Sequence, residues 1–113
     1  MQTDVKKDKR NAGRLSGSFR LEIAVLQKDS LRKGRPAVAR NLSAEGALFT
    51  SSTPLQKDEH IAIVLYHRER EIYCIGKVLR VSPSMDGGQE VAVEFAGMHE
   101  GDKKYLTDLA RSA

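Results

Sequence analysis

The chain has 113 residues, which fits one domain and excludes a two-domain enzyme. Its 19 Lys and Arg residues outnumber its 15 Asp and Glu residues, but six of the basic and only two of the acidic ones lie within the first 20 residues, so the whole excess of +4 is located there. The balanced remainder excludes a uniformly basic nucleic-acid-binding surface.

Residues 1–18 are polar and contain two glycines, which predicts a flexible basic N-terminal arm. From Phe19 onward, apolar residues alternate with polar ones, so we expect a folded domain over residues 19–113 that begins with a half-buried strand at 19–25.

Five further strands follow, separated by turn signals such as Asp86-Gly87-Gly88. They are expected at 35–42, 47–51, 60–67, 71–82 and 89–96. The segment 60–67 is largely apolar and does not alternate, which predicts burial on both faces or a barrel strand that lies under another element. In 71–82 the apolar side chains fall on odd positions, and Gly76 marks a bulge or a sharp bend.

The spacing of Tyr105, Leu106, Leu109 and Ala110 predicts a short C-terminal helix, with Asp102 as its cap. About six short strands with regular turn punctuation favour an all-β antiparallel barrel or sandwich over a parallel α/β fold. The helix would then cover an open end or an edge of the barrel.

The sequence contains no segment that approaches the roughly 20 apolar residues of a membrane span, and no apolar signal region at the N-terminus. Its single cysteine, Cys74, cannot form an intramolecular disulfide and is expected to be a small core residue. We therefore expect a cytoplasmic location.

The residues offer little for catalysis. The three histidines are scattered and have no zinc-type spacing with Cys74. No nucleophile–base arrangement, no pair of carboxylates and no phosphate-binding glycine loop stands out. The sequence therefore predicts a protein that is not an enzyme and has no metal site and no resident cofactor.

Two short motifs remain. The first is R-x-x-x-R, formed by Arg10 and Arg14 on the arm, and the second is N-x-S-x-x-G, formed by Asn41, Ser43 and Gly46 at a turn. Each also has a plain structural interpretation: two arginines can arise by chance in a basic tail, and Asn, Ser and Gly are ordinary turn residues. The chemistry of these residues also supports ligand binding, because Arg can bind a phosphate or the O6/N7 edge of guanine with two hydrogen bonds.

In this order and followed by these strands, the two motifs resemble the paired signature of PilZ domains, which are bacterial receptors for cyclic di-GMP. The resemblance covers about residues 9–110. It implies a six-stranded antiparallel β-barrel with a terminal helix, the same architecture as the strand pattern favours.

The resemblance also implies roles for individual residues. Arg10 and Arg14 would grip guanine edges and phosphates of cyclic di-GMP. Asn41 would bind a guanine, Ser43 would approach a phosphate, and Gly46 would leave room for the ligand. Lys9, which precedes the first motif, would tune stoichiometry, and its lack of apolar bulk favours a stacked pair of ligands.

We therefore expect a cyclic di-GMP receptor in which the ligand orders the arm against the turn and changes the surface seen by a downstream protein partner. The receptor would be a monomer or a ligand-linked homodimer. Two alternatives remain: a small barrel that binds RNA or single-stranded DNA through its basic arm, and a PilZ-like adaptor that contacts proteins without ligand. The regulated process could be motility, exopolysaccharide synthesis, adhesion or virulence.

Overall fold

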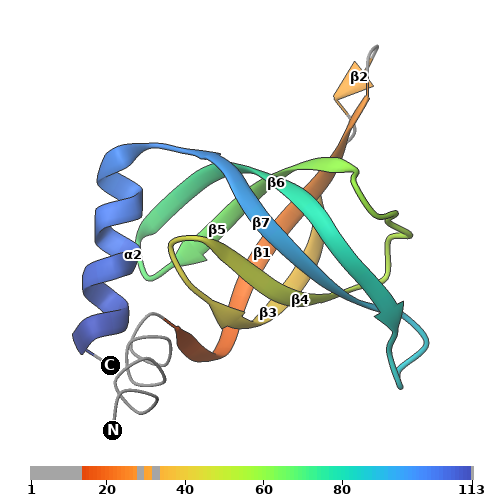
Figure 1. Cartoon of the computed structure of the whole chain (residues 1–113), viewed down its shortest axis with the longest axis horizontal. Helices are drawn as coiled ribbons and strands as arrows, with labels where there is room; N and C mark the ends of the chain where they lie inside the picture. The colour runs from red at the N-terminus through yellow and green to blue at the C-terminus, as the bar shows by residue number, and fades with distance from the viewer. Residues whose placement is uncertain (1–13, 28–29, 32–33, 113) are drawn as a thin grey trace, which may run out of the picture.

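The computed structural model describes residues 14–27, 30–31 and 34–112 (Figure 1). Within these ranges the elements follow the order β1 (Leu15–Gln27), β2 (Ser30–Leu31), β3 (Arg35–Leu42), β4 (Gly46–Ser51), β5 (His60–His67), β6 (Arg70–Pro83), β7 (Gln89–Met98) and α2 (Glu100–Ser112). The expected strands at 35–42 and 60–67 agree with β3 and β5. Strand β1, however, begins at Leu15, so residues 15–18 belong to the barrel and not to the predicted arm.

The strands form one closed antiparallel sheet. Hydrogen-bonded neighbours follow the order β1, β3, β4, β7, β6, β5, and β5 returns to pair with β1. The two-residue strand β2 only extends β1 as a hairpin. The prediction of a six-stranded antiparallel barrel with a C-terminal helix is thus confirmed, and closure leaves no long unpaired edge among the six strands.

The inner side chains of the barrel form a single apolar core, as the alternating patterns predict. In β5 every second residue is buried, but Ala62, Val64 and Tyr66 are only half-buried on the outer face, so the expectation of burial on both faces is wrong. The fully buried large side chains are Leu21, Ile23, Leu42, Phe49, Ile61, Ile63, Leu65, Ile72, Val78, Val91 and Leu106.

Strand β6 faces the core differently from the prediction. Between Ile72 and Val78 the even positions of β6 point inward, whereas Tyr73 is 62% and Leu79 is 44% exposed. Two register shifts separate β6 from β7. The first lies between Ile75 and Gly76, near the expected bulge, but its extra residue is Ala96 of β7; the second lies between Val78 and Arg80, and its extra residue is Leu79 of β6. The second bulge was not predicted and determines which side chains face outward at this edge.

Cys74 is buried in this strand, and burial raises the pKa of its thiol to about 12. It is therefore a core residue with no nucleophilic character near neutral pH, as expected. None of the helices in the described ranges is long and apolar enough to span a membrane.

Helix α2 lies at one end of the barrel beside the hairpin that joins β5 to β6 (Figure 1). His99, not Asp102, caps it, because the His99 ring nitrogen Nδ1 accepts the Gly101 N–H at 3.0 Å. Asp102 instead accepts two hydrogen bonds from Arg70, at 2.9 and 3.2 Å. Leu106 and Ala110 are buried against the core.

His67, the last residue of β5, lies where helix α2 packs against the sheet. His67 Nδ1 lies 2.6 Å from the Tyr105 hydroxyl, and the Arg70 guanidinium lies 4.2 Å from the centre of the Tyr105 ring. Burial, with a smaller contribution from the positive charge of Arg68, lowers the pKa of His67 below its usual value. The folded state therefore prefers the neutral imidazole.

We predict that this preference makes stability depend on pH. The unfolded chain binds the proton more readily than the folded one, so the stabilisation is fully present above the ordinary histidine pKa of about 6.5 and is lost as the pH falls through the lowered folded pKa. Urea unfolding across this range will show the loss, and His67→Gln will remove it. His60→Gln, at the exposed start of β5, is the control; an unchanged pH dependence in His67→Gln would contradict the assignment.

Candidate functional site

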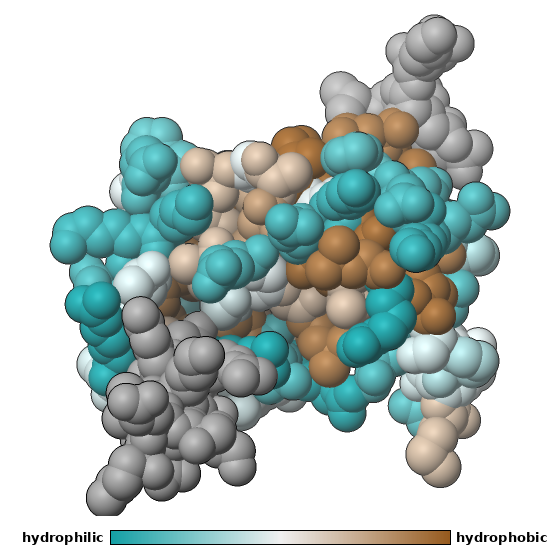
Figure 2. Space-filling model, in the orientation of Figure 1, coloured by the Kyte–Doolittle hydropathy of each residue, from teal (hydrophilic) through white to brown (hydrophobic). Residues whose placement is uncertain are grey.

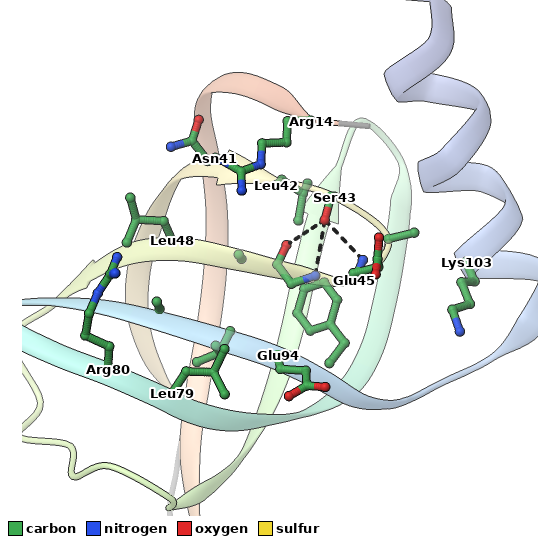
Figure 3. Close-up of a pocket in the computed structure, with 16 residues that line it drawn as sticks. Arg14, Asn41, Leu42, Ser43, Glu45, Leu48, Leu79, Arg80, Glu94 and Lys103 are labelled. Atoms are coloured by element: carbon green, nitrogen blue, oxygen red, sulfur yellow. Dashed lines mark hydrogen bonds between the residues drawn. The ribbon is translucent and has the colours of Figure 1, made fainter. Parts of the chain in front are cut away.

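The turn between β3 and β4 is held by the side chain of Ser43. Its hydroxyl oxygen accepts the backbone N–H groups of Glu45 at 3.1 Å and Gly46 at 3.2 Å (Figure 3). The Ser43 N–H donates to the Gly46 carbonyl at 2.9 Å, and the Phe95 N–H donates to the Glu45 carbonyl at 2.8 Å. The turn is therefore fixed both internally and against β7.

Gly46 is required by the close approach of two backbones. A Cβ atom at this position would lie 2.3 Å from the carbonyl oxygen of Val93, well inside the contact limit. Gly46 pairs with Glu94 in the β4–β7 ladder, and the positive-φ glycines of the described chain are Gly17 and Gly87. The structure thus shows that Gly46 allows β4 to pair closely with β7. That its missing side chain also makes room for a ligand stays a prediction.

Asn41 and Arg14 lie beside this turn. The Asn41 side chain is half-buried, and its oxygen accepts a hydrogen bond from the Ser16 hydroxyl at 3.4 Å, which leaves the amide nitrogen to face outward. Arg14 is exposed just before β1 and extends toward Asn41 (Figure 3). Near these two residues, β1 has a register shift against β3 between Ser16 and Phe19. This stretch includes Gly17, whose φ of 148° favours glycine.

These residues line one side of an open pocket of about 870 Å³ on the outer face of β3, β4, β7 and β6. Leu48 and Ala92 supply an apolar floor, and Figure 2 shows apolar surface over these strands between hydrophilic residues. Cationic groups reach the pocket from three separate elements, namely Arg14, Arg80 and Lys103. A pocket of this size with a few convergent polar groups is typical of a small-molecule site.

Two carboxylates, Glu45 and Glu94, also line the pocket. Within the part of the chain that the structure describes, neither forms an ion pair with the three cations. As far as the described residues show, the three cations can therefore face an anionic ligand. Over the same described ranges, no group of three His, Cys, Asp or Glu side chains could hold a metal ion.

Four of the residues singled out in the sequence thus come together: Arg14, Asn41, Ser43 and Gly46 all line this pocket. Lys9 and Arg10 lie outside the described residues. The sequence interpretation missed several pocket residues that come from other elements, namely Leu48, Leu79, Arg80, Glu94 and Lys103. The sequence offered no signal for the exposed pair Leu79-Arg80, because both side chains reach this face only through the bulge between Val78 and Arg80, which was not predicted.

A family model described as PilZ domain matches residues 8–112. The Bacillus subtilis inhibitor of motility MotI/DgrA superposes with a TM-score of 0.72 at 17% identity, over 86% of this chain and 47% of that one, so this chain spans about half its length. A comparison with curated protein sequences found no significant match.

Two further solved structures are similar. The PilZ domain of YcgR from Escherichia coli, solved with c-di-GMP, gives a TM-score of 0.64 at 14% identity and covers 88% of this chain and 86% of that chain. The PilZ domain of CeSA from a cellulose-synthesizing bacterium gives 0.62 at 16% identity, with 88% and 95% covered. At these identities the likeness concerns the fold.

The close approach at Gly46 makes a stability prediction. Gly46→Ala must push β4 away from β7 or bend the turn, and we expect it to lower the free energy of unfolding by about 1–3 kcal/mol. Gly97→Ala, on β7, is the matched control because its Cβ would meet only Ile75, at an ordinary 3.9 Å. Urea denaturation of the two variants measures the difference; equal stabilities would contradict the steric account.

Proposed function

The chain belongs to the PilZ domain family, a family of non-catalytic cyclic di-GMP receptors, and on that premise we propose that it binds cyclic di-GMP in the pocket described above. The observation that carries the proposal is the convergence of Arg14, Asn41 and Ser43 on one open pocket. These three side chains come from two strand ends and a turn.

Each of these groups matches a part of the ligand. The Arg14 guanidinium is exposed and can bind a phosphate or the O6/N7 edge of guanine with two hydrogen bonds. The outward amide nitrogen of Asn41 can donate to a guanine acceptor. The Ser43 oxygen already accepts two turn N–H groups, and its own hydrogen makes only a long 3.4 Å contact with the Gly46 carbonyl, so that hydrogen can turn to a phosphate.

The proposal extends to the residues before Arg14. The ligand phosphates would neutralise Arg10 and Arg14, and the segment carrying them would dock against the turn at 41–46. A partner protein would then recognise the altered surface, which couples binding to output through the ordering of a segment. Lys9 would favour a stacked pair of ligands, so a stoichiometry of one ligand per chain would contradict that part.

A nucleic-acid-binding function receives less support from the outer surface. Bases of a nucleic acid stack on exposed aromatic side chains, and Tyr73 is such a side chain. Its hydroxyl, however, donates to Glu71 at 2.8 Å, and that of Tyr66 donates to Glu22 at 3.0 Å. These carboxylates raise the pKa of both tyrosines and would repel a phosphate backbone at the same surface.

Titration calorimetry of the full chain tests the proposal. We expect wild type to bind cyclic di-GMP, and Arg14→Ala to weaken binding about tenfold or more, because hydrogen bonds to charged groups contribute roughly 1.5–3 kcal/mol. Arg35→Ala, at the opposite end of β3 from Asn41, removes the same charge outside the pocket and should leave the affinity unchanged.

Three other results would contradict the proposal in distinguishable ways. Equal losses in Arg14→Ala and Arg35→Ala would indicate a general charge effect. Binding of an oligonucleotide alone, with steep salt dependence, would favour the nucleic-acid alternative. No binding of either ligand would favour an adaptor that acts through protein contacts.

A further inference from the structure

We propose that Leu79 and Arg80 form a second base subsite, at the β6 side of the pocket, which recognises the guanine of cyclic di-GMP that lies farther from Asn41. This inference rests on the proposed function and adds to it residues outside the two sequence motifs. It is carried by the bulge in β6, by the row of residues across the pocket floor and by the guanidinium of Arg80, which has no partner among the described residues.

The bulge places both side chains on the same face. Residues of a regular strand alternate between faces, so Val78 and Arg80 would both point inward. The register shift between Val78 and Arg80 interrupts this alternation: Val78 is fully buried, and Leu79 and Arg80 are both exposed and both line the pocket. A bulge that redirects a side chain in this way is a frequent feature of functional sites.

The pairing of the strands sets Arg80 opposite Asn41 across the pocket. Asn41 pairs with Leu48, Leu48 with Ala92, and Ala92 with Arg80, so these four residues form one row over β3, β4, β7 and β6. Three strand spacings separate the ends of the row, about 14 Å at 4.7–4.9 Å per strand. The row therefore offers a polar group at each end and an apolar floor between them.

The Arg80 side chain extends from β6 toward Leu48, over this floor (Figure 3). No ion pair or hydrogen bond engages it within the described part of the chain. Glu90, which lies two residues from Ala92 on β7, is already paired with Arg40. Among the residues that the structure describes, no group occupies the donors of the Arg80 guanidinium, so they can bind a ligand.

The chemistry of the pair fits a guanine. The planar guanidinium matches the two adjacent acceptors O6 and N7, whereas adenine presents a donor in place of O6. Leu79, 44% exposed beside it, offers an apolar contact for the face of a base. A phosphate would use the charge of Arg80 but would not distinguish between the two purines.

The test compares cyclic di-GMP with the mixed cyclic GMP–AMP dinucleotide, which keeps one guanine for the Arg14–Asn41 side and replaces the other by adenine. We expect wild type to bind cyclic di-GMP about tenfold or more tightly than the mixed ligand, since a good bidentate pair discriminates by that order. Arg80→Ala should bind both with nearly equal affinity. Arg80→Lys, which keeps the charge without the planar fork, should lose the preference as well.

Arg35→Ala is the control for charge and should keep the wild-type preference, and thermal unfolding of each variant verifies the fold. An unchanged preference in Arg80→Ala, an equal weakening of both ligands, or a full preference in Arg80→Lys would each overturn the second subsite while leaving the proposed function intact. Failure of wild type to bind cyclic di-GMP at all would overturn both.

Discussion

The close approach of β4 to β7 at Gly46 is the contact on which the arrangement of the site depends. The backbone of Gly46 lies so near the Val93 carbonyl that no side chain fits between them. This pairing joins the β1–β3–β4 half of the barrel to the β7–β6–β5 half. It also presses the Ser43 turn onto β7 through the Glu45–Phe95 hydrogen bond. The pocket therefore spans both halves because these backbones meet.

The pocket follows from that junction. Its floor is the outer face of paired strands, so the positions of Leu48 and Ala92 are fixed by backbone register and not by flexible loops. Three cations surround this floor: Arg14 lies just before β1, Arg80 is on β6 and Lys103 is on α2. A rigid sheet that gathers cations from distant parts of the chain suits a compact dianionic ligand. The helix end is held by the separate cluster of Arg70, Asp102 and Tyr105.

The sequence predicted what depends on local pattern. Alternation located the strands, and the spacing of Asn41, Ser43 and Gly46 indicated the turn that lines the pocket. The sequence pattern failed where the hydrogen-bond register determines which face of a strand a side chain occupies, because a bulge moves side chains to the other face without any change in composition. For this reason Leu79 was placed on the wrong face and Arg80 was missed. Tyr73 lies before the bulge, and the alternation there did not show which face of β6 is buried. Asp102 resembled a cap, but a partner distant in sequence, Arg70, engages it instead.

The central claim is that the ligand occupies the outer face of β3, β4, β7 and β6, and amide chemical-shift mapping by NMR tests it most directly. On addition of cyclic di-GMP, the largest shifts should occur at residues 41–48 and 92–94 and at Arg80. The amides of the outer face of β5, around Val64, should change little. Shifts centred on β5, or spread evenly over the barrel, would contradict the account.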